Sequence, residues 1–258
     1  MQTVLFHETI FGPIHSRRLG SSLGVNLSPR DGKACTFDCL YCEAGFNAQG
    51  PGTTGLPSRD DVRRLLEEKL SAMKSSGQKL DVITFSGNGE PTMHPQFEEI
   101  IGDTITLRDR YYPEVKISVL CNSTCLDRPG VSRALRRVDN NILKLDSAID
   151  KTIRQIDRPN RRDFNAEKVI GQIAGFGHAC IVQTMMLRGE YDGKTIDNTT
   201  DEEIEALITA YKRIGPRQVM LYSIDRKTPA EHLQKVEHDE LQAIAEKIRA
   251  HGINVSVT

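Results

Sequence analysis

A chain of 258 residues is long enough for one large α/β domain, and no shift in composition along it marks an internal boundary. The formal net charge is −1, from 34 basic and 35 acidic side chains, so the overall charge favours neither nucleic acid nor a membrane surface. No apolar run approaches the ~20 residues that cross a bilayer, and the start of the chain lacks the pattern of a signal peptide. We therefore expect a cytoplasmic protein, in which the cysteines are free thiols, metal ligands or catalytic groups rather than disulfides.

Short apolar runs and amphipathic segments alternate along the whole chain. The predicted strands are 23–27, 81–85, 115–120, 141–145, 179–187, 218–222 and 253–257. The predicted helices begin after Ser58, near Pro95, near Asp127, at Asn165, after Thr200 and before Leu241. Residues 45–57, which are rich in Gly, Thr and Pro, and the polar, arginine-rich residues 157–162 are predicted to be loops. This alternation is typical of βαβ units around a parallel sheet, which is an α/β fold.

Three cysteines, Cys35, Cys39 and Cys42, lie within one short segment between the first two predicted strands. Thiolates so close in sequence can all face one metal centre, whereas a disulfide would leave one of them unpaired. The segment therefore indicates a metal or cluster site with one ligand position left for another group.

Polar side chains follow each of the next predicted strands in turn. They are Ser86 to Pro91, Asn122 with Ser123, Asp146 with Ser147, and Tyr222 to Arg226. Functional groups in parallel α/β folds gather beyond the carboxyl ends of the strands, so we expect these residues and the cysteine segment to share one rim.

The cysteine spacing, with the aromatic Tyr41 directly before Cys42, resembles the signature loop of the radical S-adenosylmethionine (SAM) superfamily. By this resemblance, Cys35, Cys39 and Cys42 bind three irons of a [4Fe-4S] cluster, and the amino and carboxylate groups of SAM bind the fourth. The superfamily's second mark is a Gly-Gly-Glu-like turn after the second strand. Asn88, Gly89 and Glu90 stand in that place, and a glycine turn with a carboxylate suits the ammonium group of methionine.

A larger part of the chain is similar to the radical SAM proteins that resemble wyosine-base synthases of transfer RNA. The residues that carry this likeness are 12–13, 16–25, 87–92, Lys144-Leu145-Asp146, Arg158-Pro159-Asn160 and 221–226. It implies a partial (β/α)6 TIM-like barrel over about residues 22–258, in a single domain 1–258 with an N-terminal extension 1–21. It also implies that Asn122, Lys144, Asp146 and Gln183 contact the ribose or carboxylate of SAM and that the backbone of Tyr41 contacts adenine. Wyosine-base synthases are expected to carry a second cluster upstream, yet no cysteine precedes Cys35, so the likeness extends to the scaffold and not to the substrate.

The resemblance implies an enzyme that cleaves SAM reductively at its cluster, so that a 5′-deoxyadenosyl radical abstracts hydrogen from a substrate. The substrate would be an RNA base, a peptide or a small molecule, and a one-electron donor such as flavodoxin or ferredoxin would be a partner. Transfer RNA is possible as a partner, although the net charge does not favour it, and no membrane partner is expected.

Other interpretations of the same residues stay open. The three cysteines could bind zinc with His15, Cys121, Cys125 or Cys180 as the fourth ligand, or Cys39 and Cys42 could form a redox pair. The protein could also activate a glycyl-radical enzyme. Cys121, Cys125 and Cys180 themselves are predicted to be small core residues. Finally, the arginines at 154, 158, 161 and 162 form either a phosphate-binding patch or a solvated loop of salt bridges.

Overall fold

A computed structural model describes residues 4–16 and 20–258 of the chain. The predictions that fall on Arg17, Arg18 and Leu19, and on the first three residues, lie outside this part. Within it, none of the helices combines the length and the apolar character needed to cross a membrane.

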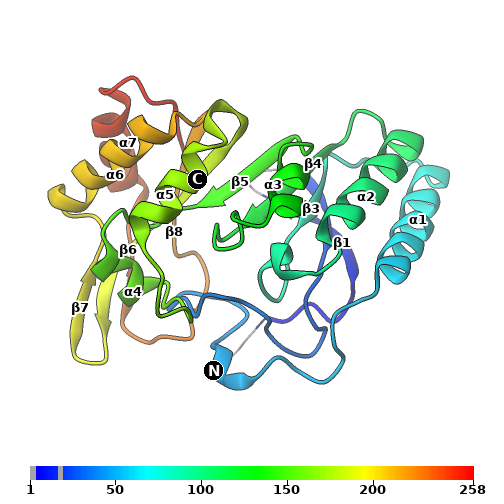
Figure 1. Ribbon diagram of the computed structural model, residues 1–258, viewed down its shortest axis with the longest axis horizontal. Helices are drawn as coiled ribbons and strands as arrows, with labels where there is room; N and C mark the ends of the chain where they lie inside the picture. Colours follow the sequence, from blue (N-terminus) through cyan, green and yellow to red (C-terminus); the bar gives the residue numbers. More distant parts are fainter. Residues whose placement is uncertain (1–3, 17–19) are drawn as a thin grey trace.

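The strands of the described residues form one open sheet of ten strands (Figure 1). Its main path, in spatial order, is β1 (Ile10–Ser16), β2 (Gly20–Val25), β3 (Val82–Phe85), β4 (Lys116–Cys121), β5 (Asn140–Lys144), β6 (Ile181–Tyr191), β8 (Gln218–Ser223) and β10 (Val255–Val257). All neighbours from β2 onward are parallel, and β1 pairs with β2 antiparallel at one edge. The sheet does not close, so the predicted α/β fold with a partial barrel is confirmed.

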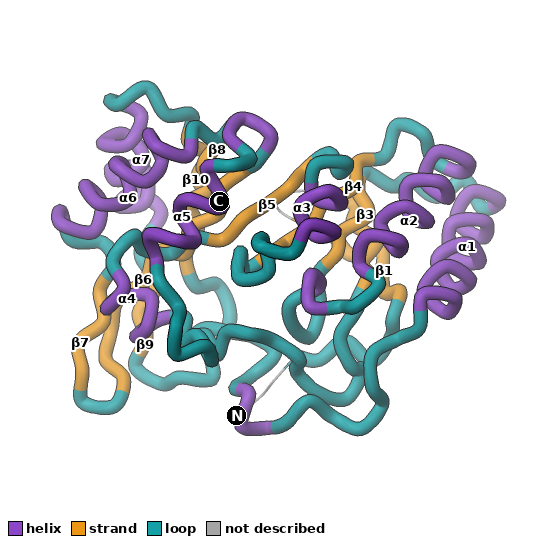
Figure 2. The backbone as a smooth tube through the Cα atoms, in the orientation of Figure 1, coloured by secondary structure: helices purple, strands orange, loops and turns teal. Residues whose placement is uncertain are grey.

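Helices cover one face of the sheet in two groups (Figures 1 and 2). They are α1 (Arg59–Ser75), α2 (Phe97–Tyr111) and α3 (Pro129–Leu135) on one side of β5, and α5 (Ala166–Ala174), α6 (Asp201–Ile214) and α7 (His238–Arg249) on the other. Three predicted caps are present, because the side chains of Ser58, Asn165 and Thr200 accept hydrogen bonds from backbone amides in the first turns of α1, α5 and α6.

The two faces of the sheet differ in chemistry because side chains alternate along each strand. Phe85 packs edge to face on Phe97 of α2, and the residues in register with it, Val25 and Val119, lie on the same apolar, helix-covered side. The other face is polar: Ser22 is hydrogen-bonded to Thr84 at 2.8 Å. The predicted site lies at the carboxyl ends of the strands, at the edge of this polar face.

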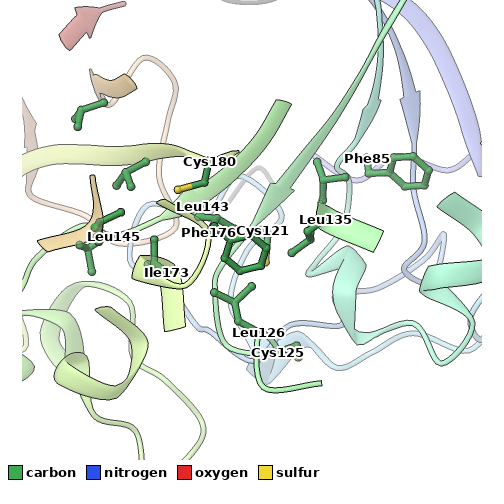
Figure 3. Packing of buried hydrophobic residues seen from close by; sticks show 14 of the residues in the cluster. Phe85, Cys121, Cys125, Leu126, Leu135, Leu143, Leu145, Ile173, Phe176 and Cys180 are labelled. Carbon is green, nitrogen blue, oxygen red and sulfur yellow. The ribbon is translucent and has the colours of Figure 1, made fainter. Parts of the chain in front are cut away.

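Cys121, Cys125 and Cys180 belong to the helix-side core, as Figure 3 shows. All three are buried beside apolar side chains such as Leu143 and Phe176. The prediction that they are small core residues agrees with this packing.

The structure contains elements that the sequence pattern did not indicate. Strand β1 lies within residues predicted to be an extension, and helix α4 (Asp150–Ile156) lies just before the predicted arginine-rich loop. Strand β6 also runs past the sheet and pairs antiparallel with β7 (Lys194–Asp197) and β9 (Leu233–Lys235). These two strands extend the sheet off its main path, beside the far end of β6.

Candidate active site

The cysteine loop, residues 35–42, follows β2 at the carboxyl edge of the sheet. Its three thiols are free; Cys39 is buried, and Cys35 and Cys42 are half-buried. Within the loop, the amide of Phe37 donates to Sγ of Cys35 at 3.4 Å, and the amide of Cys42 donates to the carbonyl of Cys39 at 3.2 Å. The loop is therefore compact and ordered by its own backbone.

The turn after β3 lies directly against this loop. Ala34 and Gly89 form a parallel bridge, in which the amide of Ala34 donates to the carbonyl of Asn88 at 3.1 Å and the amide of Glu90 donates to the carbonyl of Ala34 at 3.0 Å. A Cβ atom on Gly89 would lie 1.9 Å from the carbonyl oxygen of Ala34. Only glycine permits this close approach of two backbones.

Asn88 explains the departure from a Gly-Gly-Glu turn. Its side chain is fully buried and points away from the rim into hydrogen bonds with the backbone of Phe6 and with the carbonyl of Pro29. The substitution therefore adds an anchor for the N-terminal segment and leaves the backbone of the turn facing the cysteine loop.

The carboxylate of Glu90 connects the turn after β3 to the loop after β4. It accepts hydrogen bonds from the amide and hydroxyl of Thr92, at 3.0 and 2.5 Å, and from the amide of Asn122 at 2.6 Å. Burial raises the pKa of Glu90, and these hydrogen bonds act in the opposite direction. In this structure Glu90 therefore positions its neighbours.

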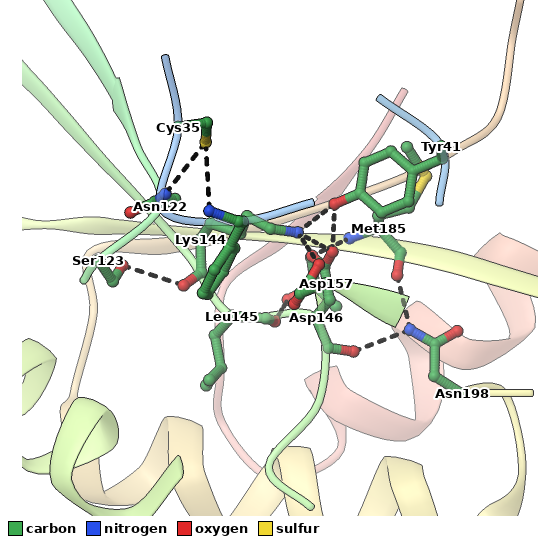
Figure 4. A network of polar contacts seen from close by, with 12 residues as sticks. Cys35, Tyr41, Asn122, Ser123, Lys144, Leu145, Asp146, Asp157, Met185 and Asn198 are labelled. Carbon is green, nitrogen blue, oxygen red and sulfur yellow. Dashed lines mark hydrogen bonds and ion pairs between the residues drawn. The ribbon is translucent and has the colours of Figure 1, made fainter. Parts of the chain in front are cut away.

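Asn122 places an amide group on the cysteine loop from the end of β4. Its Nδ2 lies 3.5 Å from Sγ of Cys35 (Figure 4). The same Nδ2 donates to the hydroxyl of Thr36 at 2.8 Å, and Oδ1 accepts from the amide of Thr124 at 3.1 Å. The residue thus closes a local turn and also contacts the predicted cluster ligand.

Lys144, at the end of β5, is the centre of a buried charged cluster (Figure 4). Its Nζ contacts the carboxylate of Asp146 and the hydroxyl of Tyr41, and it lies 2.6 Å from Oδ1 of Asp157. Burial lowers the pKa of Lys144, but Asp146 and Asp157 outweigh it, and the pKa ends well above its usual range. Gln183 is in register with Lys144 on β6 and is buried beside it.

The pKa of Asp157 is set by the same neighbours. Burial raises its pKa to about 7, the charge of Lys144 acts against that rise, and the carboxylate of Asp146 adds to it. The cluster therefore holds one ammonium group among two carboxyl groups and a phenol. These three neighbours take up the three N–H donors of Lys144 and fix the cation at the rim.

The segment that follows α4 holds the cysteine loop from a second side, and the sequence pattern did not indicate it. The amide of Asp38 donates to the carbonyl of Asp157 at 2.9 Å, and the amide of Leu40 donates to the carbonyl of Ile156 at 2.9 Å. Asn160 adds two further bonds, from its amide to the carbonyl of Thr36 and from its side chain to the carbonyl of Cys35, both 3.0 Å. The signal for these residues was the Arg158-Pro159-Asn160 motif, which the pattern predicted only as part of a loop.

Two further segments complete the enclosure of the loop. The amide of Ala230, in the loop after β8, donates to the carbonyl of Leu40 at 3.2 Å. The amide of Val4 donates to the carbonyl of Glu43 at 2.9 Å, and Arg226 pairs with the carboxylate of Glu43 at 2.5 Å. The N-terminal segment and the loop after β8 therefore join the turn after β3 and the segment after α4 around the cysteine loop.

The donor set fits an iron–sulfur cluster. Burial, reinforced by Glu90, raises the pKa of Cys35 to about 12, and burial also raises the pKa of Cys39. Thiols held in this way become thiolates only beside a strongly positive centre, which bound iron supplies. Among the described residues, no three His, Cys, Asp or Glu side chains are arranged around a single metal ion. A cluster does not require such an arrangement, because each thiolate binds a different iron.

Of the side chains considered as a fourth zinc ligand, His15 lies on strand β1 and is exposed. Cys180 is fully buried below the rim, where its thiol donates to the carbonyl of Gly177 at 3.2 Å. The predicted site residues are otherwise brought together. The turn 88–90, Asn122 and the Lys144 cluster follow or end strands at the same edge as the cysteine loop, and Gln183 lies within β6 in register with Lys144.

Comparison with known proteins agrees with this geometry. A protein designated UPF0026 from Helicobacter pylori is 28% identical over 236 residues, which cover 90% of this chain and 71% of that protein. The crystal structure of a radical SAM methyltransferase from Sphaerobacter thermophilus superimposes with a TM-score of 0.68 at 17% identity, over 92% of this chain and 65% of that one. The structure of TYW1 with a lysine-pyruvate adduct bound superimposes with a TM-score of 0.59 at 14% identity, over 90% of this chain and 75% of that one.

The two structural likenesses show the fold, and the chain spans somewhat less than two thirds of the methyltransferase. The family itself is shown by a sequence model, because the model of the radical SAM superfamily matches residues 31–198, a segment that begins before Cys35 and ends after the Lys144 cluster. The chain belongs to the radical SAM superfamily, whose members use a [4Fe-4S] cluster and SAM.

Proposed function

We propose that this protein is a radical SAM enzyme that cleaves SAM reductively and uses the product to remove a hydrogen atom from a substrate. The chemistry supplied by the bound cluster and SAM is one-electron cleavage of the sulfonium S–C5′ bond, which gives methionine and a 5′-deoxyadenosyl radical. The observation that carries the proposal is the bridge between Ala34 and Gly89, because it joins the three-cysteine loop to the Asn88–Glu90 turn.

The residues of this chain divide the work of binding. Cys35, Cys39 and Cys42 would hold the cluster, and the backbone of the turn at Gly89 would face the ammonium group of methionine. Lys144 would exchange one of its present partners for the carboxylate, and Asn122 and Gln183 offer amides for polar groups of the ligand. Burial of the cluster loop under four segments limits access of water to the reacting groups.

The cluster interpretation replaces the zinc and thiol-pair alternatives, because the family uses iron–sulfur chemistry. Activation of a glycyl-radical partner stays a prediction, and it differs from the main proposal in one measurable way. An activase would form 5′-deoxyadenosine only when the partner protein is present.

The experiment is anaerobic reconstitution with iron and sulfide, followed by incubation with SAM and dithionite. Wild type should take up both elements, develop broad visible absorption and release 5′-deoxyadenosine and methionine. A triple Cys35, Cys39 and Cys42→Ala variant should do none of these, whereas Cys180→Ala, which removes a core thiol elsewhere, should retain them. Wild type that takes up no more iron and sulfide than the triple variant would overturn the proposal.

A further inference from the structure

An open hollow of about 630 Å³ lies on the outer side of the cysteine loop. Its lining includes Asp38 of the loop itself, Asn47, and Arg154, Arg158 and Asn160 from α4 and the segment after it. We call it the α4 hollow. None of the contacts of Lys144 or of the Asn88 turn uses this surface, so it is separate from the rim site.

Two side chains that line the α4 hollow are hydrogen-bonded to the backbone of the cysteine loop. The side chain of Asn160 donates to the carbonyl of Cys35 at 3.0 Å, and the side chain of Asn47 donates to the carbonyl of Phe37 at 3.1 Å. The other sides of the loop are covered by the turn after β3, the N-terminal segment and the loop after β8. A molecule seated in the α4 hollow would therefore approach the cluster loop directly.

Basic side chains gather around this hollow. Lys151 and Arg154 are three residues apart on α4, a spacing that places side chains on one side of a helix, and Arg158 follows the helix and lines the hollow with Arg154. Arg162 lies close by, because Arg154 donates to its backbone carbonyl at 3.3 Å. The side chains of Lys151 and Arg162 are exposed, and among the described residues neither has a hydrogen-bond or ion-pair partner.

The acidic groups of the same surface are largely neutralised. Asp38 lies 3.2 Å from the guanidinium of Arg158 and 3.7 Å from the ammonium of Lys33. Asp157 faces inward to Lys144, and Asp163 pairs with Arg161 at 2.8 Å. Asp150 keeps its charge and accepts a hydrogen bond from the backbone amide of Ala166 at 2.6 Å, but Lys151, Arg154 and Arg162 outnumber it. The surface that remains is positive although the whole chain carries a net charge of −1.

We infer that the α4 hollow is the docking surface of an acidic protein that carries single electrons. The inference rests on the proposed function, because reductive cleavage of SAM consumes one electron per event. The carrier loses one electron and this protein gains it, with no transfer of atoms. The interfaces between redox proteins are small, and complementary charge guides the two proteins together. An open basic hollow beside the cluster loop suits such an interface.

The test uses reduced flavodoxin as the carrier and a Lys151→Glu/Arg162→Glu double variant of the full chain. The double variant should bind flavodoxin about tenfold or more weakly at low salt, with the difference shrinking at high salt as the charges are screened. Binding is measured calorimetrically with the oxidised carrier, so it does not depend on turnover. The rate of reduction by flavodoxin should fall in parallel.

Dithionite separates the inference from the proposed function, since it is a small reductant that needs no docking surface. Dithionite should support equal 5′-deoxyadenosine formation in wild type and in the double variant. Failure of wild type with dithionite would count against the proposed function, whereas equal flavodoxin binding by both proteins would overturn the docking inference alone.

Two single charge reversals serve as controls of position. Arg63→Glu changes an exposed arginine of α1, which lies far from α4 in Figure 1, and should leave flavodoxin binding unchanged. Lys227→Glu changes an exposed lysine of a second hollow, formed by the loop after β8. If Lys227→Glu weakens flavodoxin binding more than the double variant does, the inference is overturned. It is also overturned if the double variant loses affinity for transfer RNA but keeps its affinity for flavodoxin.

Discussion

The side chain of Asn88 is hydrogen-bonded to both backbone polar groups of Phe6: its Oδ1 accepts from the amide at 2.8 Å and its Nδ2 donates to the carbonyl at 2.9 Å. The same Nδ2 donates to the carbonyl of Pro29 at 2.9 Å. One side chain of the turn therefore fastens the N-terminal segment across the site. Asn88→Ala should lower the free energy of unfolding by about 2–3 kcal/mol in urea denaturation, because the amide of Phe6 and the buried carbonyl of Pro29 lose the hydrogen bonds that Asn88 makes with them.

A matched control is Asn254→Ala, which removes an exposed asparagine with one hydrogen bond to the carbonyl of Arg217. That change should cost about 0.5 kcal/mol or less. Equal effects of the two substitutions would show that the contact between Asn88 and Phe6 has no special weight.

Gly89→Ala should disturb the contact between the turn and the cysteine loop. The added methyl group would meet the carbonyl oxygen of Ala34 at 1.9 Å, and a backbone atom cannot move away as a flexible side chain can. We expect a loss of about 1–3 kcal/mol in stability, together with less iron bound per protein after reconstitution. Gly102→Ala is the control, since that glycine lies within α2, where a methyl group would meet nothing closer than 3.7 Å. It should be neutral or stabilising by up to about 1 kcal/mol.

Lys144→Met should be strongly destabilising, because it leaves the buried carboxyl groups of Asp146 and Asp157 without their cation. Loss of one partner of a buried ion pair costs about 3–5 kcal/mol. Adding Asp157→Asn should recover part of the loss, so the double variant should be more stable than the sum of the single effects predicts. Strict additivity in denaturant titrations would contradict the coupling between Lys144 and Asp157.

The free energy of unfolding should depend on pH through Glu203, and the substitution Glu203→Gln should remove this dependence. Burial raises the pKa of Glu203 above its usual value of 4.5, against hydrogen bonds from Ser147 at 2.6 Å and Thr152 at 2.5 Å. The folded protein therefore binds a proton that the unfolded chain releases, so this contribution is present below about pH 4.5 and is lost as pH rises through the raised pKa. Melting temperatures measured from about pH 4 to pH 8 should diverge between the two proteins. Parallel profiles would exclude a role for Glu203.

The main strands and caps could be predicted because local pattern and final structure agree. Predicted strand 218–222 matches β8 (Gln218–Ser223) closely, and Thr200, which forms the pair of a capping box with Glu203 in the sequence, caps α6. The second member of that pair behaves differently, because the carboxylate of Glu203 turns to Ser147 and Thr152 rather than to the start of its own helix. A distant partner overrode the local pattern there.

Helix α4 could not be found from periodicity because it is short and ends in a polar, arginine-rich stretch. Its importance comes from backbone bonds between Asp157 and Asp38 and between Ile156 and Leu40, which no side-chain pattern records. The structural role of Asn160 could not be predicted either, because its partners are also backbone carbonyls of the cysteine loop. In contrast, the neighbours of the cysteine loop could be expected from strand order, since the turn at Gly89 and the end of β5 at Lys144 reach the same edge by topology alone.

The enclosure of the cysteine loop also governs when the site can form. Its partners at Val4, Asn88, Ile156 and Ala230 are spread over nearly the whole described chain. Contacts of such high sequence separation form late in folding, so the thiols reach their final places only after the sheet has assembled. Iron that binds there then adds its binding free energy to every segment that touches the loop. Removal of iron should accordingly loosen the N-terminal segment and the loop after β8 together, and hydrogen exchange at the amides of Val4 and Ala230 would report both at once.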